Sequence, residues 1–256
     1  MSLLHIHQFR CLDDNYGVLI HDAGSGVTAS IDAADAGAIA EELAAKRWNL
    51  THILTTHHHA DHTQGNLELK AASGCTILGP AAEAGRIPGI DVALADGDIY
   101  RLGAFDVRVI STPGHTAGHC VYWIPEADVA FVGDTLFALG CGRVFEGTPE
   151  MMWNSLRKLM ALPPETAIYC GHEYTAANAR FALTIEPENE ALQQRAREVA
   201  DLAARHQPTI PTRIGLELET NPFLRPHSKA IRARLGLERA KDWQVFAEIR
   251  ARKNKA

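Results

Sequence analysis

The sequence predicts an α/β body followed by a mainly helical C-terminal segment, and two features of the chain lead to this prediction. Over roughly the first 170 residues, short runs rich in β-branched side chains alternate with amphipathic stretches. From Thr148 onward the apolar residues recur mostly at helical spacing, and prolines interrupt the pattern. We therefore expect one domain over residues 1–174 and a second, helical domain over residues 175–256. A chain of 256 residues is long enough to bury a core in this arrangement.

The strands of the body are expected where apolar and β-branched residues form short runs. Over residues 35–48, Ile39, Leu43 and Ala44 recur at helical spacing, so a helix should connect two of these strands. The second of the two ends at Thr55, and the carboxyl ends of strands are where open α/β sheets assemble their sites. The expected strands are Tyr16–His21, Val27–Asp32, His52–Thr55, Phe105–Ser111, Val121–Ile124, Asp128–Val132 and Ala167–Cys170.

Helices dominate the rest of the chain. Thr148 and Pro149 form a plausible N-cap and first helical residue for a helix over Met151–Leu162. Five prolines, at positions 187, 208, 211, 222 and 226, break the later helical pattern because proline disrupts a helix interior. The expected helices of the C-terminal domain are Thr175–Ile185, Glu188–Arg205, Ser228–Leu235 and Lys241–Arg252.

Charge and composition argue against several classes of function. The net charge is −6 and the Lys and Arg residues are dispersed, so we expect no nucleic-acid partner. No apolar run approaches the ~20 residues that span a bilayer, so we expect no membrane role. The segment Met1–Arg10 lacks the pattern of a secretory signal. The five cysteines are scattered and odd in number, which suits reduced thiols in the cytoplasm.

The segment Thr56–His62 reads THHHADH and directly follows a predicted strand. Imidazole nitrogens and a carboxylate form a ligand set that suits Zn²⁺ and other divalent first-row ions. His57 and His59 can share one side of an extended turn while Asp61 and His62 reach a second point, which leaves room for two ions. The alternative is a solvated histidine-rich loop, but further candidate ligands follow later strands.

Three other strand ends carry such candidates. The segment Thr112–His119 contains His115 and His119 among glycines, and composition does not decide which of the two binds a metal. Asp134 follows another strand and could bridge two cations, and His172 follows a third. A single polar residue at a strand end is usually a cap, but four such ends in one chain indicate a metal centre.

The order H-x-H-x-D-H, then His, Asp and His, resembles the metallo-β-lactamase superfamily over about the first 175 residues. The resemblance implies an α+β fold, the αββα sandwich, here with a C-terminal helical domain. It favours His115 over His119 as a ligand and leaves His58 without a metal contact. It also makes Asp32 a residue that orients one of the ligands. The implied ligands are His57, His59 and His115 for one ion, Asp61, His62 and His172 for the other, and Asp134 between them.

The implied cofactors are two divalent metal ions, with zinc expected first and iron or manganese as alternatives. The resemblance implies catalysis by a hydroxide that bridges the ions, with Asp134 and Asp61 as the carboxylates of the catalytic centre. No serine or cysteine nucleophile is required, so we interpret Cys141 and Cys170 as packing thiols.

Further segments resemble glyoxalase II within this superfamily. They are Asp14–Tyr16, Gly140–Gly147, Gly171–Thr175 and Asn221–Arg225. This resemblance implies hydrolysis of S-(2-hydroxyacyl)glutathione thioesters, with lactoyl as the expected acyl group. It also implies that the helical domain binds glutathione. The expected partner is therefore this small molecule, and we expect a monomer.

Glutathione carries two carboxylates, so its site should offer cations and other donors. Arg143, Tyr174, Arg225 and Lys229 meet this requirement. Animal members of the family tend to have Lys and Tyr where this chain has Arg143 and Phe145. Phenylalanine lacks the hydroxyl donor of tyrosine. Phe145 would therefore bind substrate through its backbone, if at all. For Arg225 and Lys229 the alternative is a solvated surface.

Three other functions stay open. One is a glutathione persulfide dioxygenase with a single iron, a relative that shares H-x-H-A-D-H but typically lacks the long helical segment with Asn221–Arg225. Another is a different thioesterase of the same fold. The third is a non-catalytic metal-binding scaffold, which the presence of every expected ligand argues against.

Overall fold

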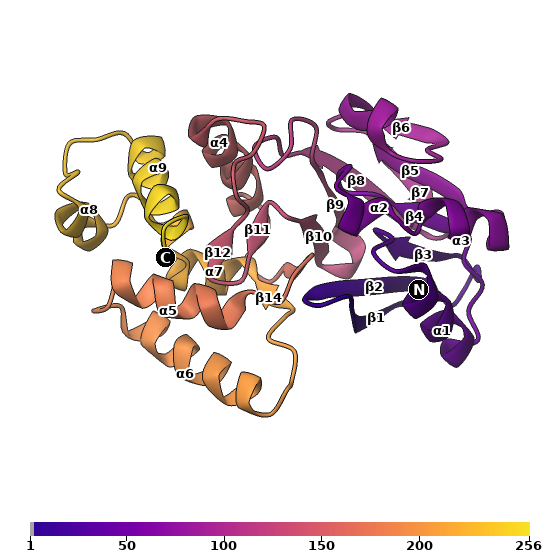
Figure 1. The fold of residues 1–256 in the computed structure, drawn as a ribbon, viewed down its shortest axis with the longest axis horizontal. Coiled ribbons are helices and arrows are strands. Elements are labelled where there is room, and N and C mark those ends of the chain that lie inside the picture. The colour runs from indigo at the N-terminus through magenta and orange to yellow at the C-terminus, as the bar shows by residue number, and fades with distance from the viewer. Residues whose placement is uncertain (1–2) are drawn as a thin grey trace. The chain divides into compact units, whose positions relative to one another are not determined.

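The computed structural model describes residues 3–256, which form two compact units (Figure 1). The N-terminal unit comprises the chain up to Ser111 together with Thr116–Gly133. The C-terminal unit comprises Thr112–His115 and Asp134–Ala256. In the described part of the chain, no helix is both long and apolar enough to cross a bilayer.

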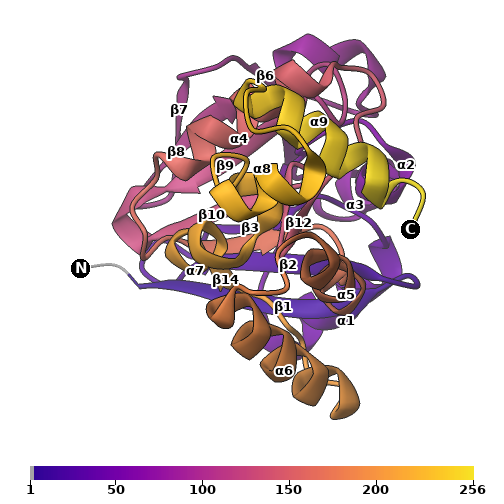
Figure 2. The ribbon, with the colours of Figure 1, turned by 90° about the vertical axis from the view of Figure 1, so that its left-hand side faces the viewer.

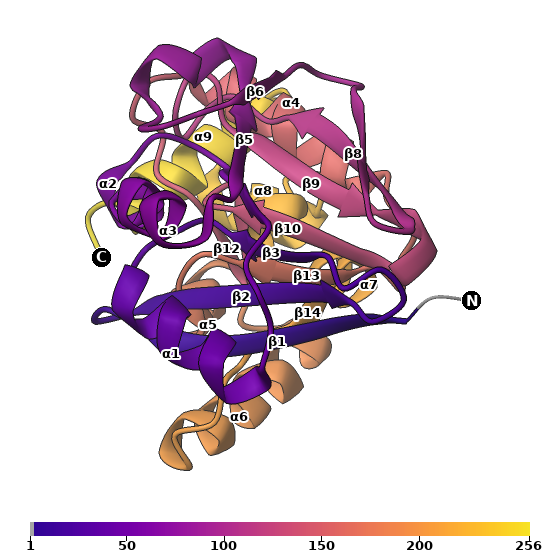
Figure 3. The ribbon, with the colours of Figure 1, turned by 90° about the vertical axis from the view of Figure 1, so that its right-hand side faces the viewer.

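A six-stranded sheet in the order β1-β2-β3-β4-β5-β6 forms one layer of the N-terminal unit (Figure 3). β1, β2 and β3 pair antiparallel, whereas β3 to β6 pair parallel. Because parallel neighbours share a direction, the chain leaves β3, β4 and β5 at the same edge, where a site can form. The strands are β1 (Leu4–Cys11), β2 (Asn15–Asp22), β3 (Thr28–Ile31), β4 (His52–Leu54), β5 (Thr76–Pro80) and β6 (Val92–Leu94).

Helices α1 (Ala36–Lys46) and α3 (Asn66–Ser73) pack against one face of this sheet (Figure 3). Asp35 caps α1 by accepting a hydrogen bond from the Ala38 amide at 3.0 Å. Ile39 of α1 and Leu69 of α3 are buried with residues of the strands in one apolar cluster. The short helix α2 (Ala60–Thr63) follows β4, and the 3₁₀ helix η1 (Ala81–Arg86) follows β5.

Four more strands complete the N-terminal unit, and each pairs antiparallel with the next along the chain. Their inner residues, such as Val121 and Phe131, are fully buried. The strands are β7 (Ile99–Leu102), β8 (Phe105–Ser111), β9 (Cys120–Ile124) and β10 (Val129–Gly133), with the 3₁₀ helix η2 (Pro125–Ala127) between the last two.

The C-terminal unit is mainly helical (Figure 2). It begins with the two-residue strands β11 (Leu136–Phe137) and β12 (Gly140–Cys141), which pair antiparallel, as do β13 (Ala167–Cys170) and β14 (Thr212–Arg213). Helices α5 and α6 pack side by side over an apolar cluster that includes Leu139. The helices are α4 (Pro149–Met160), α5 (Thr175–Ile185), α6 (Glu190–Ala204), α7 (Ile214–Thr220), η3 (Pro222–Leu224), α8 (Lys229–Leu235) and α9 (Asp242–Lys253).

The elements expected from the sequence are present, and their ends lie within two residues of the predicted ones. The structure adds shorter elements that the sequence pattern did not reveal, among them β5, β6, α2 and α7. Thr55 and Asp32, expected as last residues of strands, lie just beyond β4 and β3. Thr148 caps α4 as expected, with its hydroxyl accepting from the Met151 amide at 3.2 Å.

Candidate metal centre

The loop after β4 carries His57 and His59 with their rings turned toward each other. The Nε2 atom of His57 and the Nδ1 atom of His59 lie 3.0 Å apart, so the two nitrogens face a common point. His57 is fully buried, and Thr56 before it hydrogen-bonds through its carbonyl to the Cys120 amide at 2.9 Å. This hydrogen bond holds the loop to the first residue of β9.

Asp32 holds the same loop from the end of β3. Its carboxylate accepts hydrogen bonds from the amide and the hydroxyl of Thr56, at 2.7 and 2.9 Å, and lies 2.8 Å from Nδ1 of His62. Asp32 has a φ of 57°, a left-handed conformation that aspartate tolerates better than most residues. Because Nδ1 of His62 faces Asp32, its Nε2 is the nitrogen available to a metal.

Asp61 is fixed by a residue from the first β-hairpin. The side-chain amide of Asn15 donates to the Asp61 carbonyl at 3.1 Å and to its carboxylate at 3.4 Å. The same carboxylate lies 3.7 Å from Nε2 of His62, so these two candidate ligands point the same way. The Asp14–Tyr16 segment, noted in the sequence without a role, therefore contributes a positioning contact through Asn15.

In the C-terminal unit, His115 and His172 approach one carboxylate oxygen. Nε2 of His115 lies 3.4 Å and Nε2 of His172 lies 3.3 Å from Oδ2 of Asp134. Nδ1 of His115 lies 2.9 Å from the Arg143 carbonyl oxygen, which can only accept, so that nitrogen carries a proton and Nε2 is the nitrogen that can bind a metal. The three side chains are buried.

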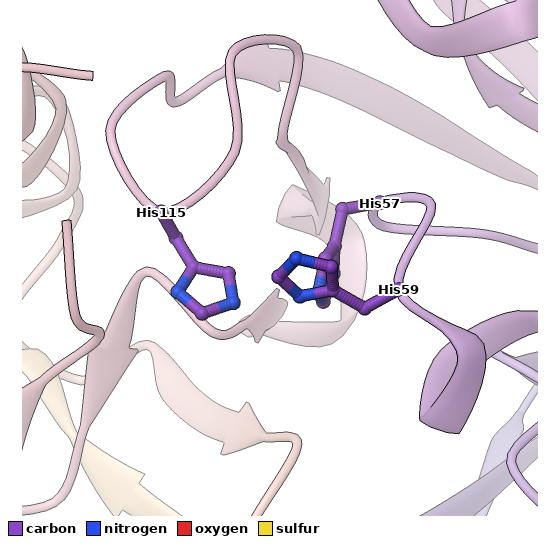
Figure 4. A group of neighbouring side chains, drawn as sticks. All are labelled: His57, His59 and His115. Carbon is purple, nitrogen blue, oxygen red and sulfur yellow. The ribbon is translucent and has the colours of Figure 1, made fainter. Parts of the chain in front are cut away.

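Figure 4 shows His57, His59 and His115 as neighbouring side chains. Candidate ligand atoms of these three residues lie within 4.8 Å of one another. The same holds for His57, His62 and Asp134, and for Asp61, His62 and His172. Imidazoles with carboxylates and without thiolates form a donor set that fits a divalent first-row ion.

The two other histidines of these segments, His119 and His58, make different contacts. His119 is fully buried, and its ring stacks on that of His57 with centroids 4.9 Å apart. His58 turns toward Glu83, with its Nδ1 atom 2.7 Å from the carboxylate. His119 belongs to none of the groups of candidate ligands in the described residues, whereas His58 belongs to one, with Glu83 and Glu146.

The two cysteines near these ligands in sequence are buried thiols. Burial raises the pKa of Cys141 to about 11 and that of Cys170 to about 12. Both therefore stay protonated near neutral pH, and neither supplies a thiolate nucleophile.

Three of the expected substrate-binding residues lie close to the histidines of the C-terminal unit. The exposed ring of Phe145 lies 5.2 Å from that of His115, and the ring of Tyr174 stacks on His172 at 4.9 Å. Arg143, whose carbonyl faces His115, has an exposed side chain. Lys229 is exposed at the start of α8.

Arg225 is engaged within the protein. Its Nε and Nη2 atoms donate to the two oxygens of the Glu186 carboxylate at 2.8 and 3.0 Å, and Nη1 donates to the Leu218 carbonyl at 3.1 Å. Glu186 is only 3% exposed. Burial by itself would raise the pKa of Glu186, but hydrogen bonds from Arg225, Ser228 and Asn189 outweigh burial and lower it.

The structure also groups cations that the sequence reasoning missed. A pocket of about 550 Å³ is lined by Arg180, Phe181 and Lys253, among others. The pKa of Lys253 is lowered, first by burial and then by the charges of Arg250, Arg180 and Arg143. The signal available in the sequence was the i, i+3 spacing of Arg250 and Lys253 in the last helix, which places both on one face.

Comparison with known proteins agrees with this picture. Residues 12–172 match the metallo-beta-lactamase superfamily, and residues 173–256 match the hydroxyacylglutathione hydrolase C-terminus. Among solved structures, ETHE1 from Myxococcus xanthus is 24% identical, with a TM-score of 0.68, over 97% of this chain and 98% of that one. BLEG-1 B3 metallo-beta-lactamase is 21% identical, with a TM-score of 0.66, over 86% of this chain and 100% of that one. These likenesses show the fold.

Two curated relatives are much closer in sequence. Hydroxyacylglutathione hydrolase of Brucella ovis is 60% identical over 98% of both chains. That of Brucella canis is 60% identical over 98% of this chain and 96% of its own. The chain belongs to the hydroxyacylglutathione hydrolase family, also called glyoxalase II. The fold class and the kind of enzyme expected from the sequence, a metal-dependent thioester hydrolase, are thereby confirmed.

Proposed function

We propose that the chain hydrolyses S-D-lactoylglutathione to D-lactate and glutathione in the detoxification of methylglyoxal. Relatives named hydroxyacylglutathione hydrolase support the substrate class. The observation that carries the chemistry is the approach of His115 and His172 to the same oxygen of Asp134, at 3.4 and 3.3 Å. Two imidazoles directed at one carboxylate oxygen suit a residue that binds two cations at once.

The metal assignment is part of the proposal. Asp134 would bind both ions, and Asp32 would orient His62. Two bound ions would lower the pKa of a water that they share and would polarise the acyl oxygen of the thioester. Zinc suits the donor set best, with iron or manganese as alternatives. The proposed ligands are His57, His59 and His115 for one ion and Asp61, His62 and His172 for the other.

Asp61 and Asp134 are the proposed catalytic carboxylates. The side-chain amide of Asn15 restrains Asp61 by a hydrogen bond. Asp134 is restrained by its contacts with His115 and His172. Carboxylates held in this way keep their orientation while charge develops on the substrate, so no energy is lost in reorienting them.

Glutathione would bind through cations and donors of the C-terminal unit. Arg143 and Tyr174 lie beside the proposed ligands, and Phe145 offers its backbone. Lys253 adds a cation that could bind a carboxylate of glutathione. Neighbouring positive charges disfavour the charged form of Lys253, and a bound carboxylate would offset this repulsion. Arg225 would contribute through the N–H groups that Glu186 and Leu218 leave available, since a guanidinium has five. Lys229 is the last proposed contact.

We place the division between a catalytic domain and a glutathione-binding domain at residues 174 and 175. We also propose a cytoplasmic monomer. All five cysteines are free and buried, which suits a reducing compartment.

A comparison of two thioesters tests the proposed function. Purified, metal-loaded protein should hydrolyse S-D-lactoylglutathione with a kcat/KM far above that for a simple acyl thioester without the glutathione portion. Equal rates would reduce the proposal to a general thioesterase. Oxygen consumption with glutathione persulfide, without thioester hydrolysis, would replace the proposal with the dioxygenase.

A further inference from the structure

Glu83 is a buried carboxylate that binds the backbone of two loops in the N-terminal unit. The residue lies in η1 and is 2% exposed. Its Oε2 atom accepts a hydrogen bond from the His58 amide at 2.9 Å and lies 2.7 Å from Nδ1 of the same residue. Its Oε1 atom accepts a hydrogen bond from the Gly118 amide at 2.7 Å.

The first of these contacts lies between two proposed ligands. His58 separates His57 from His59, so a restraint on its amide limits how both neighbouring side chains are directed. The remainder of this loop is held on either side, by Asp32 at the Thr56 amide and by the Thr63 hydroxyl at the His59 carbonyl, 3.0 Å away. Glu83 adds a restraint at His58, in the middle of the loop.

The second contact lies in the loop that also contains His115. An added Cβ atom at Gly118 would stand 2.6 Å from Cγ of Glu83 and 2.8 Å from Cβ of Ala82, closer than carbon atoms approach. Glycine at this position therefore allows the backbone amide to reach the carboxylate. The sequence pattern does not predict the contact between Glu83 and Gly118, because 35 residues separate them.

We propose that Glu83 is a positioning residue of the metal centre, which sets the backbone of the two loops that carry His57, His59 and His115. A buried carboxylate that accepts hydrogen bonds from two backbone amides resists displacement, because either amide would lose its acceptor. Glu83 is neither one of the proposed ligands of the two ions nor one of the proposed substrate contacts. The inference rests on the proposed function only in taking these three histidines as metal ligands.

Four variants test this role, with Co²⁺ as the probe, because its visible absorption reports the ligand geometry. Glu83→Ala removes both acceptors, and Glu83→Gln keeps one oxygen and should retain part of the function. Gly118→Ala displaces the carboxylate without removing it. Glu68→Ala, which removes an exposed carboxylate from α3, is the matched control. Each metal-free variant is first compared with wild type by thermal melting, so that loss of fold is recognised.

We expect Glu83→Ala to lower Co²⁺ affinity by about 10- to 100-fold in chelator competition, as is typical when a residue that orients metal ligands is removed. Its Co²⁺ absorption spectrum should change shape, and kcat should fall while KM stays near the wild-type value. Glu83→Gln and Gly118→Ala should show smaller losses of the same kind, and Glu68→Ala none. If Glu83→Ala does not fold, the other two variants decide the outcome.

Wild-type Co²⁺ affinity and spectrum in folded Glu83→Gln and Gly118→Ala would overturn the inference. So would a lower melting temperature without any change in either property, since that result describes a residue of the fold alone. Failure of the proposed function is a different result, because wild type itself would then bind no Co²⁺ or leave S-D-lactoylglutathione intact.

Discussion

Nε2 of His172 lies 3.3 Å from Oδ2 of Asp134, and His115 approaches the same oxygen from a separate loop. This relationship leads to the first prediction. Asp134→Ala should lower kcat on the order of a thousandfold, because several kcal/mol of charge stabilisation depend on a correctly held pair of ions. It should also weaken at least one metal site. Steady-state kinetics and metal analysis of the purified variant check both effects, and normal turnover with full metal content would show that Asp134 does not bridge.

Metal removal should reduce both activity and thermal stability. A ligand that binds only the folded state stabilises it by about 4 kcal/mol at a thousandfold excess over its Kd. Metal-free protein should therefore be inactive and melt several degrees below the Zn²⁺-loaded protein. Addition of Zn²⁺ should restore both properties. An unchanged melting temperature after verified metal loss would mean that the histidine cluster does not stabilise the fold through a bound ion.

Arg225 is predicted to contact substrate although Glu186 already binds it. Arg225→Ala should raise KM for S-D-lactoylglutathione by about ten- to a hundredfold at unchanged kcat, since a charge-assisted hydrogen bond contributes roughly 1.5 to 3 kcal/mol. A thioester without glutathione should react equally with both proteins. Glu186→Gln, which keeps Arg225, is the control. A lower melting temperature with unaltered KM would make Arg225 solely the partner of Glu186.

The Glu186 pair also predicts an effect of pH on stability. Because the pKa of Glu186 is lowered in the folded protein, its contribution is present above the ordinary value of 4.5 and is lost as pH falls further. The free energy of unfolding should therefore decrease more steeply below pH 4.5 in wild type than in Glu186→Gln. Urea unfolding at pH 3 to 6 measures this, and parallel pH profiles would contradict it.

Glu217 should behave in the opposite sense. It is fully buried, and burial raises its pKa although Thr212, Leu139 and Asn221 all donate to it. The folded state thus favours the protonated acid, and stability should decline as pH rises above 4.5. Glu217→Gln can keep these contacts without a charge. It should therefore match or exceed wild-type stability at pH 7, whereas Glu217→Ala should lose about 1 to 3 kcal/mol.

Much of the candidate site was predictable because its residues follow strands. His57, His59, Asp61 and His62 lie in one short segment after β4, and the sequence shows both the strand and the ligand types. The choice between His115 and His119 was not predictable from the residues alone. Only the resemblance favoured His115, which follows Gly114, a residue with a φ of 147°.

Contacts between distant segments could not be predicted. Glu83 pairs with His58 across 25 residues and Arg225 with Glu186 across 39, and neither pairing leaves a local pattern. Lys253 was not singled out in the sequence, because the cations near it, Arg180 and Arg143, lie far away along the chain. The short strands and helices, such as β14 and α7, were missed because two to seven residues carry too little periodicity.

The most direct test of the proposed chemistry is the rate of S-D-lactoylglutathione hydrolysis by metal-free protein titrated with Zn²⁺. We expect essentially no hydrolysis without metal and a rise in rate that reaches its plateau at two ions per chain. Full activity without metal, or a plateau at one ion with the second site unfilled, would contradict a centre in which Asp134 holds two ions.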